Sequence, residues 1–186
     1  NGSYANGYML DYIVKIFKEK KYYPEYFITS QQDIVILTNN FFVDMKKKFM
    51  SKTFAVGVLK QKNKSNEFDI LHSVCCMWKY KYILLSEEGF LPKLPRFDAG
   101  EKIVLEFKNK GLEIDYFKNS YNDPSVLKKI EKKFLEIGEG IDRAINENSE
   151  VIFMHLGRGL GKSQGTYKKQ NRVGVEKWLD WCRENL

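Results

Sequence analysis

The chain has 186 residues, of which 43% are hydrophobic and 15% aromatic, and its formal net charge is +7 with a pI near 9.1. This composition excludes a disordered tail and is enough for one sizeable domain or two small ones. No stretch approaches the ~20 apolar residues of a membrane-spanning helix, so we expect no membrane partner. The excess of lysine and arginine favours an anionic partner such as nucleic acid, with a merely solubilising lysine-rich surface as the alternative.

The first predicted elements alternate between helix and strand. The spacing of Met9, Tyr12, Ile13, Ile16 and Phe17 predicts a helix over 8–19 with these residues on its apolar face. A β-branched run predicts a strand over 34–37. A second helix is expected to follow Asn39 or Asn40, with three residues pointing inward: Phe42, Met45 and Phe49.

Three further stretches of the first half are strand candidates. They are TFAVGVLK, FDILHSVCCMW and KYKYILL, the second of which is also compatible with a helix. The segments KYYPEY (21–26) and MWKYKY (77–82) interleave lysine with aromatic residues, as a stacking and phosphate-binding face does, but any strand with one solvated face gives the same alternation. We assign residues 1–90 to an α/β amino-terminal part.

The second half, residues 91–186, contains the strongest predicted elements. KIVLEF (102–107) is expected to be a strand, and Asp123 and Pro124 are expected to begin a long helix that reaches Ile145. Gly138 and Gly140 are positions at which this helix could kink or be interrupted. EVIFMHL (150–156) predicts a strand, and the last helix carries Val175, Trp178, Leu179 and Cys182. This order resembles the closing half of a ferredoxin-like βαβ unit. The predicted fold is therefore α+β, with a ferredoxin-like (RRM-like) sheet, helices on one face and a C-terminal glycine-rich loop.

The glycine-rich stretch HLGRGLGKSQGTYKK (155–169) contains GKS, the end of a nucleotide-binding P-loop. A P-loop needs its first glycine at position 156, where this chain has Leu156, and too few residues follow Ser163 for the rest of an NTPase core. The stretch has no acidic residue from Gly157 to Val175, whereas five residues are cationic. Glycines allow backbone N–H groups to approach phosphates, so the stretch is typical of a loop that binds an RNA backbone.

These residues predict an RNA-binding site without catalytic groups. Glycines would shape the loop, Tyr167 would stack on a base, and Ser163 and the cationic side chains would contact phosphates. The predicted RNA-binding residues are Gly157, Arg158, Gly159, Gly161, Lys162, Ser163, Gly165, Tyr167, Lys168, Lys169 and Arg172.

The order LPRFDAGEKIVLEF, helix, VIFMHLGRGLGKSQGTY resembles the RAMP superfamily of CRISPR-associated RNA-binding proteins. The glycine spacing is most similar to that of the Csm-type subunit near the 3′ end of the guide RNA. The resemblance implies an antiviral defence protein that holds guide RNA within a multi-subunit ribonucleoprotein and does not cut it. It also implies that Gly157, Gly159, Gly161 and Gly165 form the loop, with Arg158, Lys162 and Ser163 facing the RNA backbone.

Two enzyme classes and one binding class are the alternatives. Asp98, Glu106 and Lys108 imitate the carboxylate and lysine set of metal-dependent nucleases, although a hairpin would hold the two carboxylates far apart. A metal-independent endoribonuclease would need a histidine as general base, and His72 and His155 are the only histidines. The third alternative is a protein-interaction domain.

The cysteines and the amino terminus complete the expectations. Cys75, Cys76 and Cys182 form no CxxC pair and, with two histidines, no zinc-ligand set, so we expect no metal and no cofactor. Free thiols indicate a reducing, cytoplasmic compartment. The opening NGSYANG has no initiating methionine and is expected to be a loop or the cut end of a longer protein.

Overall fold

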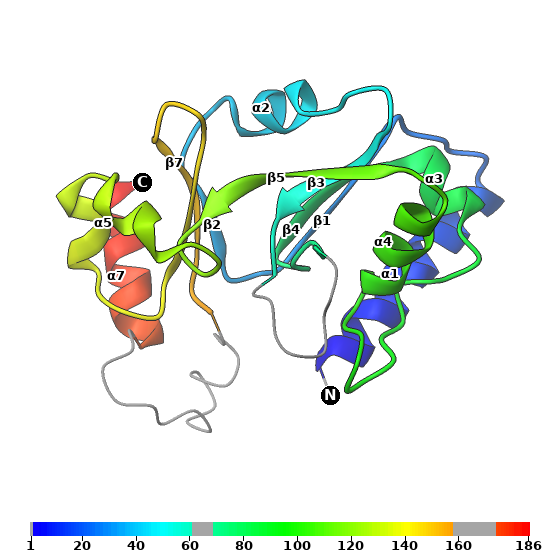
Figure 1. Ribbon diagram of the computed structural model, residues 1–186. Coiled ribbons are helices and arrows are strands. Elements are labelled where there is room, and N and C mark those ends of the chain that lie inside the picture. Colours follow the sequence, from blue (N-terminus) through cyan, green and yellow to red (C-terminus); the bar gives the residue numbers. More distant parts are fainter. Residues whose placement is uncertain (1, 61–68, 158–173) are drawn as a thin grey trace. The chain divides into compact units, whose positions relative to one another are not determined.

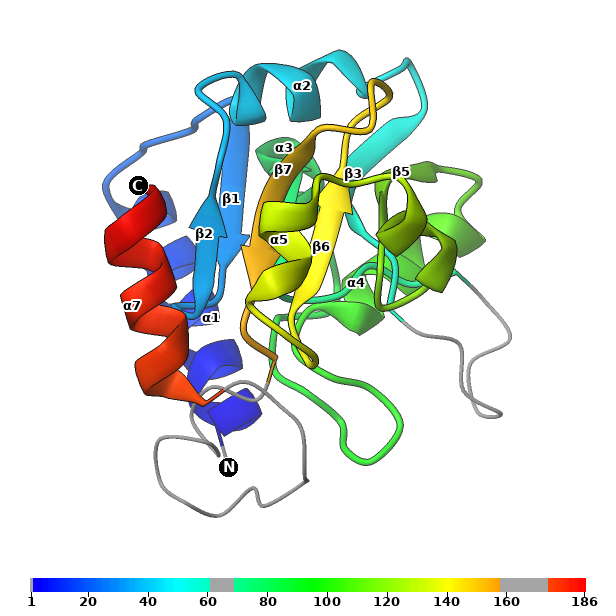
Figure 2. The same ribbon diagram turned by 90° about the vertical axis from the view of Figure 1, so that its left-hand side faces the viewer.

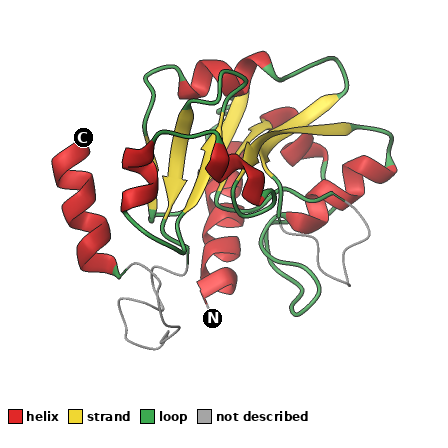
Figure 3. Ribbon diagram, turned by 60° about the vertical axis from the view of Figure 1, so that its left-hand side comes forward, coloured by secondary structure: helices red, strands yellow, loops and turns green. Residues whose placement is uncertain are grey.

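A computed structural model describes residues 2–60, 69–157 and 174–186 (Figure 1). The chain forms two compact units: unit 1 comprises Asn1–Gln31 and Met45–Tyr116, and unit 2 comprises Gln32–Asp44 and Phe117–Leu186. The predicted division at residue 90 therefore falls inside unit 1. Helices and strands occur in both units, and the predicted α+β class is confirmed (Figure 3).

Unit 1 is built on an antiparallel sheet in which β4 lies between β1 and β3. Its elements are α1 (Gly2–Glu19), β1 (Tyr26–Ser30), β3 (Thr53–Val58), β4 (Cys75–Lys79), α3 (Tyr80–Leu85) and α4 (Glu101–Asn109). Two elements cross the division between the units: α2 (Phe41–Lys47) ends in unit 1, and β5 (Glu113–Asn119) begins there.

The core of unit 1 lies between this sheet and the helices α1, α3 and α4, which stand together in Figure 1. Phe27, Phe54 and Trp78 from the three strands pack with Phe90 and Phe107. The predicted helix over 8–19 is confirmed, but its buried face differs from the prediction. Val14 is the fully buried residue of that helix, whereas Met9 and Tyr12 are exposed.

Unit 2 contains an antiparallel sheet in the order β5–β6–β7–β2, and Figure 2 shows β6 and β7 side by side. Its other elements are β2 (Ile34–Ile36), the 3-10 helix η1 (Pro124–Lys128), α5 (Lys132–Glu136), β6 (Asp142–Ile145), β7 (Val151–His155) and α7 (Val175–Asn185). The predicted strands at 34–37 and 150–156 and the last helix are confirmed.

The core of unit 2 joins η1, α5 and α7 to the strands β6 and β7. Every residue of β7 is buried, which agrees with its uninterrupted apolar sequence. From α7, Trp178 and Trp181 enter the same cluster as Leu156, the residue that follows β7. Leu179, predicted on the apolar face, is instead exposed.

Two predicted strands of unit 1 are helices. KIVLEF lies within α4, where Ile103, Val104 and Phe107 bury one side of the helix. The β-branched residues suggested a strand, but the i, i+1, i+4 spacing of the buried positions is helical. Glu101 anchors the start of α4 and is 1% exposed. Its carboxylate accepts hydrogen bonds from Lys60 Nζ at 2.5 Å and from the Asp98 N–H at 2.9 Å. KYKYILL likewise forms α3, directly after β4.

The predicted long helix from Asp123 to Ile145 is confirmed only in two short pieces, η1 and α5, and is wrong from Gly138 onward. Asp123 does cap η1 by accepting the Ser125 N–H, and Pro124 takes the first position. Gly138 and Gly140, at φ of 111° and 78°, then turn the chain in a way that a helix does not allow. Residues 142–145 become β6 because pairing with β7 outweighs their helical spacing.

These corrections bear on the ferredoxin-like prediction. A βαβ unit connects parallel strands through a helix, whereas β5, β6 and β7 are consecutive and pair antiparallel. With 102–107 helical, the predicted strand that opens the unit is also absent. A ferredoxin-like sheet is therefore not confirmed.

Candidate functional site

The predicted RNA-binding segment is bounded by described residues of unit 2. Of the predicted site residues, the structure describes Gly157. The others lie outside the described residues: Arg158, Gly159, Gly161, Lys162, Ser163, Gly165, Tyr167, Lys168, Lys169 and Arg172.

At the end of β7, His155 lies between two carboxylates. Its Nδ1 is 3.1 Å from Asp142 Oδ2, and its Nε2 is 3.5 Å from Asp33 Oδ1. The sheet explains this arrangement, because β7 is the middle strand: His155 is paired with Asp142 of β6, and Asp33 immediately precedes β2. The Leu156 N–H also donates to the Asp33 carbonyl oxygen at 3.0 Å. The last residues of β7 are thus fixed from both sides.

His155 is 4% exposed, and its surroundings hold it in the protonated form. Burial disfavours the charged ring, but the two carboxylates outweigh it and raise the pKa of His155 to about 9. A general base must be unprotonated at the working pH. The buried imidazolium therefore does not suit the metal-independent endoribonuclease alternative, in which His155 would take a proton from a 2′-hydroxyl.

The other histidine is also engaged in local structure. Nδ1 of His72 accepts the Val74 N–H at 3.1 Å, in the turn that leads into β4. This bond orients the ring and occupies one of its two nitrogens. His72 and His155 moreover belong to different units.

Gly157 is the last described residue before the basic segment, and the chain there needs a glycine. Its φ is +22°, and a β-carbon would lie 3.3 Å from the carbonyl oxygen of Gly140. A side chain at this position would crowd the turn formed by residues 138–141. Gly157 therefore lies in close contact with that turn.

Arg143 fixes this turn from within the core. It is 3% exposed and donates three hydrogen bonds to main-chain carbonyl oxygens, from Nε to Phe134 at 2.8 Å, from Nη1 to Ile141 at 2.5 Å and from Nη2 to Gly138 at 2.9 Å. Burial lowers the pKa of Arg143, and neighbouring Asp142 acts in the opposite direction. The guanidinium thus holds the last turn of α5 and the glycine turn in one arrangement.

At its other end the segment leads into α7. Gly174 is the N-cap, and Trp178 and Trp181 anchor the helix, their rings stacked with centroids 6.4 Å apart. Trp181 also packs against Phe134, at 6.2 Å between centroids. Because Leu156 belongs to the same cluster, residues on both sides of the segment lie in one hydrophobic core.

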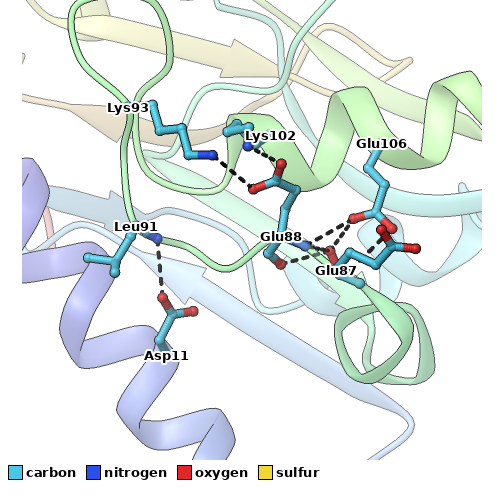
Figure 4. A network of polar contacts seen from close by, with 8 residues as sticks. Asp11, Glu87, Glu88, Leu91, Lys93, Lys102 and Glu106 are labelled. Atoms are coloured by element: carbon cyan, nitrogen blue, oxygen red, sulfur yellow. Dashed lines mark hydrogen bonds and ion pairs between the residues drawn. The ribbon is translucent and has the colours of Figure 1, made fainter.

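The three residues of the nuclease alternative have separate structural roles in unit 1. Asp98 accepts the Ala99 N–H in the turn before α4, and Lys108 Nζ donates to the Asp69 carbonyl oxygen at 3.0 Å. Glu106 accepts hydrogen bonds from the Ser86 hydroxyl at 2.5 Å and from the Glu88 N–H at 3.3 Å (Figure 4). These contacts do not bring the three side chains together around one scissile phosphate.

The same network orders the loop between α3 and α4. The Glu88 side chain pairs with Lys102 and lies 3.7 Å from Lys93, while Asp11 accepts the Leu91 N–H at 3.2 Å (Figure 4). Burial opposes ionisation of Glu106, but hydrogen bonds from Lys110, Ser86 and the backbone outweigh it and lower the pKa. Glu106 is therefore an ionised structural residue of this loop.

Replacing Glu106 by glutamine is expected to lower the free energy of unfolding by about 1–2 kcal/mol, because charge-assisted hydrogen bonds to the loop are lost. Since the folded-state pKa is lowered, this contribution is present above the ordinary pKa of 4.5 and is lost as the pH falls below it. Urea unfolding at pH 7 and pH 4 measures both effects. Glu87→Gln, on a carboxylate whose side chain is 87% exposed, is the matched control and should change stability little.

Three residues of this region were not predicted from the sequence: Asp33, Asp142 and Arg143. The only local sign in the sequence is Asp33, which precedes the predicted strand over 34–37. Acidic residues are common at strand ends, so this position alone does not indicate a partner for His155. The partners of His155, Asp33 and Asp142, lie 122 and 13 residues away in sequence. Asp142 was missed because the sequence predicted a helix, and not a strand paired with β7, at that position.

Within residues 2–60, 69–157 and 174–186, no group of three or more histidine, cysteine or acidic side chains is arranged to hold a metal ion. Over the same residues, every helix is too short or too polar to cross a membrane. Comparisons of the chain with protein-family models, with curated proteins and with solved structures found no match.

Proposed function

We propose that this protein binds single-stranded RNA through residues 157–172 and acts as a guide-RNA-holding subunit of a CRISPR-type ribonucleoprotein. The observation that carries the proposal is the composition of this segment, which combines glycines with Arg158, Lys162, Lys168, Lys169 and Arg172 and lacks any acidic residue. Such a segment contacts phosphates through main-chain and cationic groups, with little dependence on sequence.

The anchoring of both ends supports this proposal. His155 and Gly157 fix the start of the segment, and Trp178 fixes the helix that follows it. A chain whose ends are held loses less conformational entropy on binding than a free tail does. The buried, protonated state of His155 favours holding RNA over cutting it.

Replacing Lys162, Lys168 and Lys169 together by glutamate is expected to weaken binding of a fluorescently labelled single-stranded RNA by about 100-fold at 0.1 M salt. Loss of three phosphate contacts also lowers the slope of log affinity against log salt by about 2. Fluorescence anisotropy over a salt series measures both quantities. Binding by the unaltered chain should persist in EDTA and leave the RNA uncut.

The matched control replaces Lys128, Lys129 and Lys132, which also belong to unit 2 but lie outside the segment. Both triple variants have the same net charge, since three Lys→Glu changes lower +7 by 6 to +1. If the two variants weaken binding equally, overall charge explains the affinity and the segment has no special role. If the unaltered chain binds no RNA, the proposal fails.

A role in protein interaction is supported by one feature of α1. Tyr4, Tyr8 and Tyr12 follow one another at four-residue spacing, and their exposed fractions are 46%, 65% and 49%. Tyrosine is enriched in protein interfaces, whereas a solvated helix face usually carries charges. This face suits contact with a neighbouring subunit and is compatible with RNA binding elsewhere on the chain.

A further inference from the structure

The two lysine- and tyrosine-rich segments noted in the sequence, KYYPEY and MWKYKY, lie side by side in unit 1. Strands β1 and β4 pair antiparallel with Tyr26 opposite Lys79, and the Tyr80 N–H donates to the Glu25 carbonyl oxygen at 3.0 Å. Segments separated by some fifty residues in sequence are thereby brought to one place. The proposed RNA contact in unit 2 makes no use of them.

Together these segments line a cavity of about 360 Å³. Residues 23–25 contribute to its lining along with Lys79, Tyr80, Lys81 and Leu84. Its volume lies at the lower end of the ~300–1,000 Å³ that ligand sites occupy, and its lining combines apolar surface with a few polar groups, as such sites do. All of these residues belong to unit 1.

The polar groups of the cavity favour an anionic, aromatic ligand. Burial lowers the pKa of Lys79 and the nearby charge of Lys81 lowers it further, while the Glu25 carboxylate acts in the opposite direction. A negative group beside the two ammonium ions would be stabilised. Lys79 Nζ already donates to the Met50 carbonyl oxygen at 3.0 Å, which leaves Lys81 as the exposed cation. Tyr23, 61% exposed, offers a ring face for stacking.

Two further polar groups belong to residues of the cavity lining. Glu25 supplies carboxylate oxygens, which accept hydrogen bonds from an exocyclic amino group. The hydroxyl of Tyr80 is buried and has no hydrogen-bond partner among the described residues. Burial and the neighbouring Tyr23 phenol both raise the pKa of Tyr80, so this hydroxyl is neutral and able to donate.

We propose that this cavity is a nucleotide site, which takes an amino-bearing base against Tyr23 with the attached phosphate beside Lys81. The ligand is either a free nucleotide or one unit of single-stranded RNA, and the second case rests on the proposed function. The site lies in unit 1, whereas the basic segment belongs to unit 2, so each can fail without the other.

The test is an NMR titration of the ¹⁵N-labelled full chain with three probes: adenosine monophosphate, adenosine and inorganic phosphate. We expect adenosine monophosphate to shift the amide signals of residues 23–25 and 79–84, adenosine to shift them more weakly, and phosphate alone to have the smallest effect. Tyr23→Ala should weaken binding of the mononucleotide at least about fivefold, the lower limit for loss of a stacked base. Lys81→Ala should reduce the preference for the mononucleotide over adenosine.

Tyr116→Ala is the control for Tyr23, since Tyr116 is also an exposed tyrosine of unit 1 and lies outside the cavity lining. A second experiment titrates the same protein variants, and the unaltered chain, with one single-stranded RNA. If Tyr23→Ala weakens binding of both the RNA and the mononucleotide, the natural ligand of the cavity is a unit of RNA. If it weakens binding of the mononucleotide alone, the natural ligand is a free nucleotide. If neither ligand shifts these amides, or phosphate alone shifts them as strongly as the mononucleotide, the nucleotide site is overturned, even where the unaltered chain binds RNA.

Discussion

Replacing Arg143 by alanine is expected to lower the free energy of unfolding of unit 2 by about 3–5 kcal/mol. The change removes three hydrogen bonds from a buried guanidinium and leaves the carbonyl oxygens of Phe134, Gly138 and Ile141 without these donors. A buried main-chain carbonyl group without a hydrogen-bond donor destabilises the folded state by about as much as a lost hydrogen bond. Urea unfolding gives the total loss, and hydrogen exchange of the β6, β7 and α7 amides assigns it to unit 2.

Arg183→Ala is the control, because this arginine is exposed and pairs with Asp180 of its own helix. We expect it to change stability by less than about 0.5 kcal/mol. Arg143→Lys should recover little of the loss, since an ammonium cannot present the planar fork that reaches three carbonyl oxygens. An Arg143→Ala protein as stable as the unaltered chain would show that the glycine turn holds its shape without the guanidinium.

The second large effect is the pH dependence that His155 gives to unit 2. Its pKa is about 9 in the folded protein against an ordinary value of 6.5, a difference equivalent to about 3 kcal/mol of stability. Because the folded-state pKa is the higher one, the contribution is complete below pH 6.5. It declines as the pH rises and is lost above about pH 9.

Unfolding by urea at pH 6, 7.5 and 9.5 measures this dependence. The difference in stability between the unaltered chain and His155→Gln should shrink across the series. The chain has two histidines, so an NMR titration of their ring signals gives the pKa of each directly. A His155 signal that titrates near 6.5 would contradict the ion pairs with Asp33 and Asp142.

The expected effects at Arg143 and His155 bear on the proposed function through Gly157. Both residues fix the point at which the basic segment leaves the core, one through the glycine turn and the other through β7. Neither has an exposed side chain that could contact RNA. Any loss of RNA affinity in these variants, measured where they remain folded, would therefore reflect positioning of the segment.

Much of the local structure follows from the sequence alone, and the elements that do share one property. Strands β3 and β7 and helices α1 and α7 form where the sequence predicts them, because local preference and tertiary packing favour the same element type. The exact buried face was predicted less well, since Met9, Tyr12 and Leu179 are exposed. The cap of η1 by Asp123 was likewise predictable, since it depends on residues two positions apart. Composition also determined the charge of the proposed RNA-binding segment.

Other features were decided only by tertiary structure. The spacing of Ile137, Ile141 and Ile145 is helical, yet two glycines at positive φ and the partner strand β7 make residues 142–145 a strand. KIVLEF is helical because one side of it completes the core of unit 1. The His155 cluster and the cavity between KYYPEY and MWKYKY depend on strand register, which joins residues far apart in sequence. A sequence specifies such sites only through the complete fold, because register is set by the packing of whole sheets and not by any one segment.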